Sequence, residues 1–294
     1  MKIAVGPASS RLGERIAKSL NLETAEVIFK EFPDGETYVR VGGIGSDESV
    51  LLVQSMAPPQ ARNIMALLQM ASAIRDCTKG RIVAIVPYLA FARQDRAFLE
   101  GEAVSAKVVA RSMEANDVEE LYVVEPHSDE SLSWFRIPVV GIDPLQDLAS
   151  FVQNFKERRI VVAPDKGRIE QAKKLSEILG TDYGWIEKER DRHSGQLTSR
   201  IGRLPDQKGA ALLLDDIIST GGTIVRAATL LRSAGIQRID VATIHGLFAQ
   251  DGDKKIIQSG VSNIYASDTV EGKYSTYSVA NSISRTLEKV VHDV

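Results

Sequence analysis

Residues 210–223 read Ala210-Ala211-Leu212-Leu213-Leu214-Asp215-Asp216-Ile217-Ile218-Ser219-Thr220-Gly221-Gly222-Thr223. The first five residues are apolar, and a short apolar run of this kind is typical of a strand buried on both faces of a parallel sheet. Two carboxylates follow the run, and a turn rich in hydroxyl groups and glycine comes next. Apolar residues at helical spacing predict a helix over Ile224–Ala234. A buried strand, a turn and a helix in this order indicate an α/β fold.

The same alternation of strand and helix patterns extends along the chain in both directions. Short apolar runs predict further buried strands at Lys2–Val5, Val50–Gln54, Arg81–Val86, Glu119–Val124, Ile160–Ala163, Tyr183–Glu187, Ile239–Thr243 and Asn263–Ala266. Helical patterns include Ser105–Ala115, Leu145–Phe155 and Gly167–Leu179. Alternating elements imply mainly parallel sheets covered by helices. Because the pattern restarts after residues 141–144, we expect two α/β domains, residues 1–142 and 143–294.

The turn after the two carboxylates has the chemistry of a phosphate site. Gly221 and Gly222 allow the backbone to approach a ligand closely, and the free N–H groups and dipole of a helix start favour an anion. Ser219, Thr220 and Thr223 add hydroxyl donors. The sequence therefore predicts a phosphate bound at this turn.

Asp215 and Asp216 would repel a phosphate in direct contact, but they suit the hydroxyls of a sugar, or a metal, at the other end of the ligand. The alternative is an ordinary capped helix, since Ser and Thr are common before helices. The stretch is not a Walker A loop, because no Gly-Lys-Ser/Thr follows at the required spacing. The paired carboxylates favour the functional interpretation.

The composition excludes several classes of function. The chain has 36 Lys and Arg against 39 Asp and Glu, a net charge of −3 and a pI near 5.9. This balance argues against bulk binding to nucleic acid or an anionic membrane, although it allows a local basic pocket. No apolar run reaches the ~18 residues of a membrane helix. The single cysteine, Cys77, excludes an intramolecular disulfide. We expect a cytoplasmic protein.

The segment from Leu213 to Thr223 resembles the ribose-phosphate binding motif shared by phosphoribosyltransferases and phosphoribosyl pyrophosphate synthetases. The resemblance implies a phosphoribosyltransferase-like fold for both domains, each a mainly parallel sheet flanked by helices. The motif alone does not distinguish enzymes that consume the pyrophosphate ester from those that make it.

Two segments of the first half bear on this choice. The first, Phe32-Pro33-Asp34-Gly35-Glu36, lies at the tip of an expected hairpin and offers an aromatic face and two carboxylates to a base. The second, Arg93-Gln94-Asp95-Arg96, follows a buried strand and suits an aromatic plane or a polyphosphate. Alone, the first is also an ordinary turn and the second a solvated surface. Together they are similar to the ATP-binding segments of phosphoribosyl pyrophosphate synthetases, which phosphoribosyltransferases lack.

Three further segments match this family in chain order. Asp165, in Ala163–Gly167, corresponds to a magnesium-associated aspartate, and His127 falls at the position of a metal-site histidine. Lys188 and Arg190 correspond to the cations of a mobile catalytic loop, Lys188–Gln196. The resemblance covers most of the chain and implies Mg²⁺ as cofactor.

The resemblance implies an enzyme of nucleotide biosynthesis that transfers the βγ-diphosphate of Mg·ATP to the anomeric hydroxyl of ribose 5-phosphate. Its implied residues fall into three groups. Those for ATP are Phe32, Asp34, Gly35, Glu36, Arg93, Gln94 and Asp95. Those for ribose 5-phosphate are Arg190, Asp215, Asp216, Ser219, Thr220, Gly221, Gly222 and Thr223, and those for catalysis are Lys188 and Arg190. In the family the hairpin tip comes from a neighbouring subunit, which implies a homo-oligomer of at least two chains with a shared ATP site.

The chain departs from the family in places. The family's Asp-Leu-His is Glu125-Pro126-His127 here, and since nitrogen is an unusual Mg²⁺ ligand, contact through a metal-bound water is expected at His127. Glu100 and Glu102 stand where regulated members have a basic stretch, so we expect phosphate activation and ADP inhibition to be weak or absent. Two alternatives stay open: a phosphoribosyltransferase, and a non-catalytic homologue that binds nucleotide and regulates a partner.

Overall fold

The computed structural model of the chain describes residues 1–155, 157–190, 197–205 and 209–292. For six of these it describes the backbone only: Lys188, Glu189, Arg190, Leu197, Thr198 and His292. The chain forms two compact units. Unit 1 comprises Met1–Pro144, Asp268–Glu271 and Ser278–Val294, and unit 2 comprises Leu145–Ser267 and Gly272–Tyr277.

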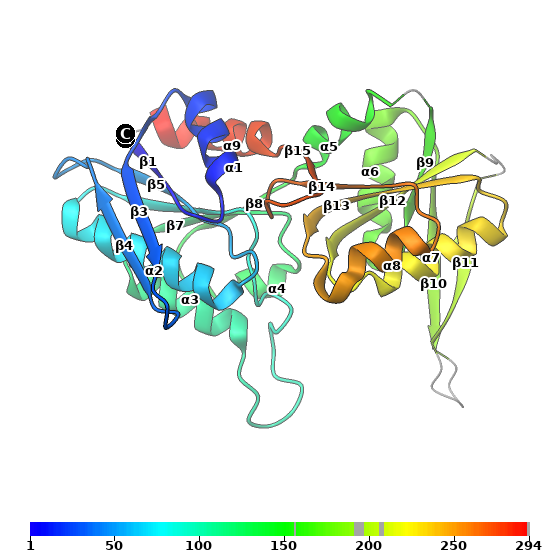
Figure 1. Cartoon of the computed structure of the whole chain (residues 1–294), viewed down its shortest axis with the longest axis horizontal. Helices are drawn as coiled ribbons and strands as arrows, with labels where there is room; N and C mark the ends of the chain where they lie inside the picture. Colours follow the sequence, from blue (N-terminus) through cyan, green and yellow to red (C-terminus); the bar gives the residue numbers. More distant parts are fainter. Residues whose placement is uncertain (156, 191–196, 206–208, 293–294) are drawn as a thin grey trace. The chain divides into compact units, whose positions relative to one another are not determined.

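Unit 1 is built on a six-stranded parallel sheet with the strand order β2-β1-β5-β6-β7-β8. Its strands are β1 (Lys2–Val5), β2 (Glu23–Thr24), β5 (Val50–Val53), β6 (Ile82–Val86), β7 (Glu120–Val124) and β8 (Val139–Ile142). Every residue of β5 and β6 is buried, because helices cover both faces of the sheet (Figure 1). Continuous apolar runs therefore predicted these strands correctly.

The helices of unit 1 lie in two layers. Helices α1 (Ser10–Leu20) and α9 (Ala280–His292) pack together on one face, and α2 (Gln60–Cys77) and α3 (Ser105–Ala115) lie on the other, with short α4 (Asp129–Leu132) after β7 (Figure 1). Four side chains of α1 and α9 are fully buried: Leu12, Ile16, Ile283 and Leu287. The expected division assigned α9 to the second domain, whereas its packing against α1 makes it part of unit 1.

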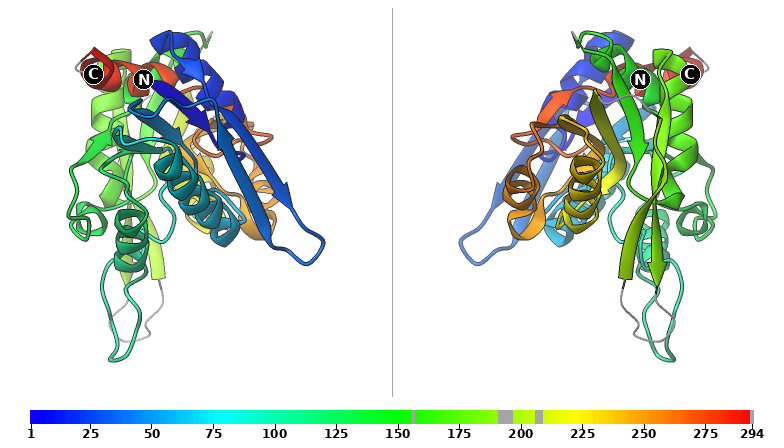
Figure 2. Two further views of the ribbon diagram at one scale, coloured as in Figure 1. Left: turned by 90° about the vertical axis from the view of Figure 1, so that its left-hand side faces the viewer. Right: turned by 90° about the vertical axis from the view of Figure 1, so that its right-hand side faces the viewer.

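An antiparallel hairpin of β3 (Glu26–Glu31) and β4 (Thr37–Gly42) lies beside α2 as a separate two-stranded sheet. The sequence predicted this hairpin. Its tip projects beyond α2 in both side views (Figure 2).

Unit 2 contains a seven-stranded sheet with the order β11-β10-β9-β12-β13-β14-β15, in which only the β10–β11 pair is antiparallel among the described strands. Its strands are β9 (Arg159–Ala163), β10 (Tyr183–Arg190), β11 (Leu197–Arg203), β12 (Ala210–Ile218), β13 (Arg238–Gly246), β14 (Asn263–Ser267) and β15 (Ser275–Tyr277). Helices α5 (Leu145–Val152) and α6 (Ile169–Leu179) pack together, as do α7 (Gly222–Ser233) and α8 (Gly252–Gln258). Two single turns, η1 (Lys166–Arg168) and η2 (Ala249–Asp251), precede α6 and α8.

Three strands of unit 2 are at least three residues longer than the sequence predicted. Strand β13, predicted to end at Thr243, continues to Gly246. Strand β12 continues past Leu214 to Ile218, because β13 pairs with it as far as Gly246. Strand β10 continues past Glu187 to Arg190, because β11 pairs with it up to the Arg190–Leu197 register position. Polar residues interrupt the apolar pattern at these strand ends, so the pattern alone did not predict the additional strand residues. No helix in the described part of the chain is both long and apolar enough to span a bilayer.

Candidate functional site

The turn between β12 and α7 is shaped by close packing against α8. Gly221 has φ +77°, a left-handed conformation that glycine adopts without strain. A Cβ atom on Gly221 would lie 2.9 Å from the carbonyl oxygen of Gly252, the first residue of α8. A Cβ atom on Gly252 would lie 2.5 Å from the carbonyl oxygen of Ser219. Glycine is therefore required at 221 by its conformation and at both positions by the close backbone approach.

This turn leaves hydrogen-bond donors available to a ligand. The first N–H groups of a helix have no intrahelical acceptor, and no side chain caps the start of α7. Ser219 and Thr223 are half-buried and Thr220 is exposed, so the three hydroxyl-bearing residues can be reached. The positive end of the α7 dipole adds to the attraction for an anion. The turn is chemically suited to a phosphate group.

Asp215 and Asp216 lie inside β12, three to four residues before Ser219, in different surroundings. Asp216 is buried, with 6% of its side chain exposed, and its Oδ2 accepts a hydrogen bond from Nη2 of Arg168 at 2.6 Å. Oδ1 of Asp215 accepts the backbone N–H of Asp216 at 3.1 Å. Burial, followed by the charges of Asp216 and Asp165, raises the pKa of Asp215 to about 8, and Arg168 opposes this rise. Burial and the neighbouring carboxylates thus favour the protonated form of Asp215, whereas Asp216 is the carboxylate paired with Arg168.

The loop after β9 belongs to the same group of side chains. Asp165 directly precedes η1 as its N-cap, and its Oδ1 accepts the backbone N–H of Gly167 at 3.0 Å. Arg168 ends η1 and reaches Asp216 on β12, the strand next to β9 in the sheet. The structure thus brings Asp165, Asp215 and Asp216 to one end of the unit 2 sheet. Arg168 could not be predicted as the partner of Asp216 from the sequence, because 48 residues separate the two.

The carboxyl ends of β6 and β7 in unit 1 bring together two further predicted segments. Asp95 lies in the loop after β6, and its Oδ2 accepts a hydrogen bond from the hydroxyl of Ser128 at 2.9 Å. The indole N–H of Trp134 donates to the carbonyl oxygen of Asp95 at 2.7 Å. Ser128 follows His127 directly, so Asp95 and half-buried His127 lie on adjoining loops. Arg93 is exposed beside them.

The loop after Asp95 is organised by an acidic side chain. Oε2 of Glu102 accepts the backbone N–H groups of Phe98 and Leu99 at 2.7 and 3.1 Å, and these two bonds lower the pKa of Glu102. The side-chain amide of Gln94 donates to the carbonyl oxygen of Arg96 at 3.2 Å and reaches the Glu102 carboxylate at 3.5 Å. A carboxylate of the chain itself therefore occupies the N–H groups that an external anion could use in this loop.

The hairpin tip presents the third predicted segment. The backbone N–H of Glu36 donates to Oδ1 of Asp34 at 3.2 Å, Gly35 has φ +91°, and Phe32 keeps 47% of its surface exposed. Among the described residues, no hydrogen bond or ion pair joins the tip to Arg93, Gln94 or Asp95.

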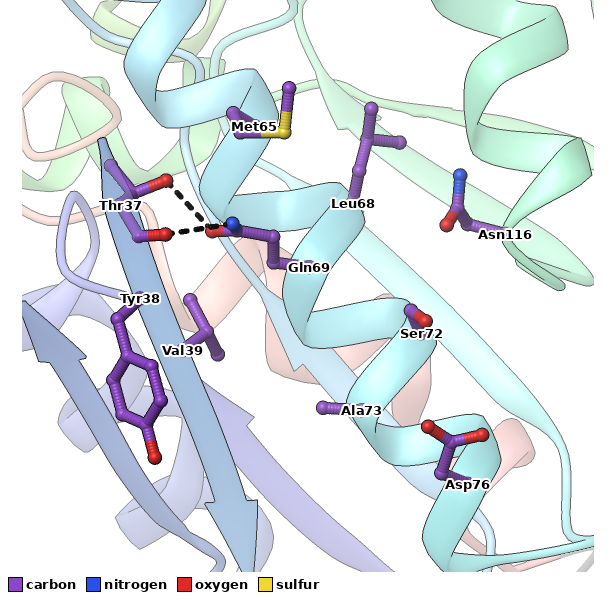
Figure 3. A pocket seen from close by; sticks show the side chains of 10 residues that line it. All are labelled: Thr37, Tyr38, Val39, Met65, Leu68, Gln69, Ser72, Ala73, Asp76 and Asn116. Atoms are coloured by element: carbon purple, nitrogen blue, oxygen red, sulfur yellow. Dashed lines mark hydrogen bonds between the residues drawn. The ribbon is translucent and has the colours of Figure 1, made fainter. Parts of the chain in front are cut away.

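A residue outside the predictions orients the tip. The side chain of Gln69 on α2 makes two hydrogen bonds with Thr37, the first residue of β4: its Oε1 accepts from the hydroxyl at 2.8 Å and its Nε2 donates to the carbonyl oxygen at 2.9 Å (Figure 3). The groove between β4 and α2 beside these bonds has a volume of about 470 Å³. Glu31, at the end of β3, also pairs with Arg62 of α2 at 2.7 Å. Gln69 was missed because only the tertiary structure places its amide beside the hairpin.

The expected catalytic residues, Lys188 and Arg190, lie at the end of the described range 157–190. The backbone of Lys188 and Arg190 lies in β10, opposite Ser199 and Leu197 of β11, and their side chains lie outside the description, as do residues 191–196 of the expected loop. No group of three or more His, Cys, Asp or Glu side chains within the described residues is arranged to hold a metal ion by itself.

Comparison with known proteins agrees with this architecture. A model of the N-terminal domain of ribose phosphate pyrophosphokinase matches residues 1–116, and a phosphoribosyl transferase domain model matches residues 145–273. Ribose-phosphate pyrophosphokinase of Sulfurisphaera tokodaii is 38% identical over 291 residues, which cover 97% of this chain and 99% of that protein. The enzyme of the same name from Methanothermobacter thermautotrophicus is 37% identical, with coverage of 93% and 95%.

A solved structure extends the likeness to three dimensions. The crystal structure of phosphoribosylpyrophosphate synthetase from Mycobacterium smegmatis matches with a TM-score of 0.85 at 26% identity, covering 100% of this chain and 99% of that one. The two-domain phosphoribosyltransferase-like α/β fold expected from the sequence is thereby confirmed. The chain belongs to the ribose-phosphate pyrophosphokinase family and is an enzyme of the diphosphotransferase class.

Proposed function

We propose that this chain transfers the βγ-diphosphate of ATP to the anomeric hydroxyl of ribose 5-phosphate and releases 5-phosphoribosyl 1-diphosphate and AMP. The observation that carries the proposal is the pairing, in unit 2, of a donor-rich turn with the Asp215–Asp216 pair next to it. Such a site can hold a phosphate at one end and sugar hydroxyls at the other. The proposed location is the cytoplasm, where both substrates are available.

Ribose 5-phosphate binds with its phosphate at residues 219–223. The N–H groups at the start of α7 and the hydroxyls of the turn donate to the phosphate oxygens. The ribose hydroxyls meet Asp215 and Asp216. Because Arg168 holds Asp216 at 2.6 Å, the Asp216 carboxylate is fixed as an acceptor, while protonated Asp215 can both donate and accept. This arrangement orients the sugar before reaction.

ATP binds in unit 1 near the loops that carry Arg93, Gln94, Asp95 and His127. Arg93 is exposed and supplies a cation for the phosphates. Phe32, Asp34, Gly35 and Glu36 contact the adenine of an ATP molecule bound to a neighbouring chain, so the active form is a homo-oligomer with shared ATP sites. The projecting tip and its exposed aromatic ring support this assignment.

Mg²⁺ is the proposed cofactor. The carboxylate of Asp165 offers the oxygen donor that Mg²⁺ prefers, and Mg²⁺ commonly uses one or two carboxylates together with substrate phosphates rather than a complete protein cage. In unit 1, His127 would contact Mg²⁺ through a metal-bound water. When bound, Mg²⁺ supplies neutralisation of the phosphate charge. The fit rests on the donor type of Asp165 and on its position at the carboxyl end of β9.

Diphosphoryl transfer needs in-line positioning and cancellation of charge more than covalent help. Lys188 and Arg190 are proposed as the cations that stabilise the diphosphate in the transition state, with Arg190 also contacting ribose 5-phosphate. Closure of residues 188–196 over the substrates would exclude water that could hydrolyse ATP. The protein's contribution is therefore to orient two substrates and to neutralise their charge.

The reaction is tested by incubating the purified chain with Mg·ATP and ribose 5-phosphate and following the products by ³¹P NMR. We expect AMP and 5-phosphoribosyl 1-diphosphate in equal amounts. Formation of ADP, or no turnover, contradicts the proposal. Consumption of the diphosphate ester with a free base and without ATP would identify a phosphoribosyltransferase instead, and ATP binding without turnover would identify a non-catalytic homologue.

A pair of variants on α7 tests the phosphate site. Thr223→Val removes a proposed phosphate donor and should raise the KM for ribose 5-phosphate about 10- to 150-fold, since a hydrogen bond to a charged group contributes about 1.5–3 kcal/mol. Thr229→Val is the matched control, because the hydroxyl of Thr229 bonds to the carbonyl oxygen of Val225, away from the turn. An equal KM in the two variants would contradict the assignment.

A further inference from the structure

The carboxylate of Glu187 on β10 joins three elements of unit 2. Its Oε2 accepts two hydrogen bonds from Arg200 of β11, from Nε at 3.2 Å and Nη2 at 2.9 Å. Its Oε1 lies 3.5 Å from Nζ of Lys166 in η1 and accepts the indole N–H of Trp185 at 3.4 Å. Only 18% of the Glu187 side chain is exposed, although Lys166 and Arg200 are mostly exposed.

The strand opposite is shaped to admit this side chain. Gly202 of β11 lies beneath Glu187 and Trp185, and a Cβ atom on it would come within 2.7 Å of Cγ of Glu187 and would also clash with the Trp185 indole. Because glycine has no side chain, the side chains of Glu187 and Trp185 can pack directly against the backbone of β11 at position 202. This packing fixes the course of the Glu187 side chain independently of its ion pairs.

The elements that Glu187 joins are those proposed to handle the diphosphate. Lys166 lies between Asp165 and Gly167, in the loop proposed to contact Mg²⁺. Arg200 is the residue directly opposite Glu187 in the β10–β11 register, one position before the Lys188–Ser199 pair. Glu187 therefore connects the loop after β9 to the strand pair that carries Lys188 and Arg190.

We propose that Glu187 is a positioning residue for diphosphate transfer, which acts by tying η1, through Lys166, to the base of the β10–β11 pair, through Arg200. This inference rests on the proposed roles of Lys188 and Arg190. The contacts of Glu187 with Lys166 and Arg200 fix the position of the β10 backbone at residue 187. They thereby determine the position of the backbone that carries Lys188 and Arg190. Glu187 itself contacts neither substrate.

The contacts of Glu187 favour a role in positioning the catalytic groups over a role in stabilising the fold. Exposed ion pairs contribute little to the free energy of unfolding, because water and salt screen them and the long side chains lose freedom. Both cations of this bridge are mostly exposed. A small misplacement of a catalytic group, by contrast, can reduce the rate about a hundredfold. Loss of the bridge should therefore reduce turnover much more than stability.

The experiment compares Glu187→Gln with Glu177→Gln, an exposed control on α6 with the same loss of charge. We expect Glu187→Gln to lower kcat about 10- to 100-fold, with the KM for ribose 5-phosphate and the Tm close to wild type and with faster hydrogen exchange in residues 183–190. Glu177→Gln should leave all four quantities unchanged. Unchanged kcat, or a fall in Tm with a matching loss of folded enzyme, overturns the inference.

Two more variants locate the effect. If Glu187 acts through Lys166, Lys166→Met should lower kcat to a similar extent, and the double variant should be no slower than the slower single variant; additive losses would refute the bridge. Gly202→Ala displaces Glu187 without changing charge and should also lower kcat. A wild-type chain that makes no AMP would refute the proposed function, while unchanged hydrogen exchange in Glu187→Gln refutes this inference whether or not the chain is active.

Discussion

Asp215→Asn should stabilise the ligand-free protein increasingly as the pH rises from 5 to 8, because it removes a carboxyl group that the fold holds in an environment unfavourable to its charge. Burial and the charges of Asp216 and Asp165 raise the pKa of Asp215 from 3.8 to about 8. The folded protein therefore keeps a proton on Asp215 that the unfolded chain releases near pH 4. Stability from this group is complete below the unfolded pKa and is lost as the pH rises towards 8.

The size of the effect follows from the shift. One bound proton changes the free energy of unfolding by about 1.4 kcal/mol per pH unit. Between pH 5 and pH 8, wild type should therefore lose at most about 4 kcal/mol through Asp215. Asparagine keeps the Oδ1 acceptor for the backbone N–H of Asp216 and carries no charge. The advantage of Asp215→Asn over wild type should grow across this range.

The assay is thermal unfolding of both proteins, without metal or ligand, at intervals between pH 5 and pH 8. A chain of this size shifts its Tm by about 2–4 °C per kcal/mol, so the two curves should diverge by several degrees towards pH 8. Asp216→Asn is the matched control: it deprives Arg168 of this carboxylate and should lower the Tm, since removing one member of a buried ion pair costs about 3–5 kcal/mol. A constant difference between Asp215→Asn and wild type at all pH values would refute the reasoning.

Four other outcomes are expected. Gly221→Ala forces a strained φ and a clash with α8, and should cost about 1–3 kcal/mol of stability by chemical denaturation and raise the KM for ribose 5-phosphate; an unchanged KM would contradict the turn's role. Gln69→Ala frees Thr37 and should raise the KM for ATP with little change in kcat, as steady-state kinetics will test. Lys188→Ala should lower kcat by orders of magnitude at nearly unchanged substrate affinity, and near-full turnover would contradict its assignment. Activity should not require free phosphate, and ADP at saturating ATP should give no sigmoidal inhibition, because Glu102 already occupies the N–H groups of its loop.

The features that the sequence predicted are those encoded locally. The apolar runs of β5, β6 and β12 identified buried strands, and the Ser-Thr-Gly-Gly turn followed β12 as expected. Parallel sheets bury both faces of a strand, so composition alone marks such strands. Because the carboxyl ends of these strands lie at one edge of a sheet, the general position of Asp165 and Asp215 could also be predicted.

The features that escaped prediction depend on residues distant in the sequence. Arg168 meets Asp216, Gln69 meets Thr37, and the length of β12 depends on its pairing with β13. Nothing in the local pattern around Arg168 distinguishes a partner of a buried carboxylate from a solvated arginine. The position of α9 in unit 1 depends on apolar residues of α1 that lie more than 250 positions earlier.

The return of α9 to unit 1 has a consequence for synthesis on the ribosome. Domains commonly fold in order from the N-terminus as the chain emerges, but the apolar side of α1 is covered by α9, a helix that follows all of unit 2 along the chain. Leu12 and Ile16 therefore stay without their partner helix until the whole of unit 2 has been translated. Of the two units, the one that emerges first is therefore completed second, and until then the apolar side of α1 is exposed to water.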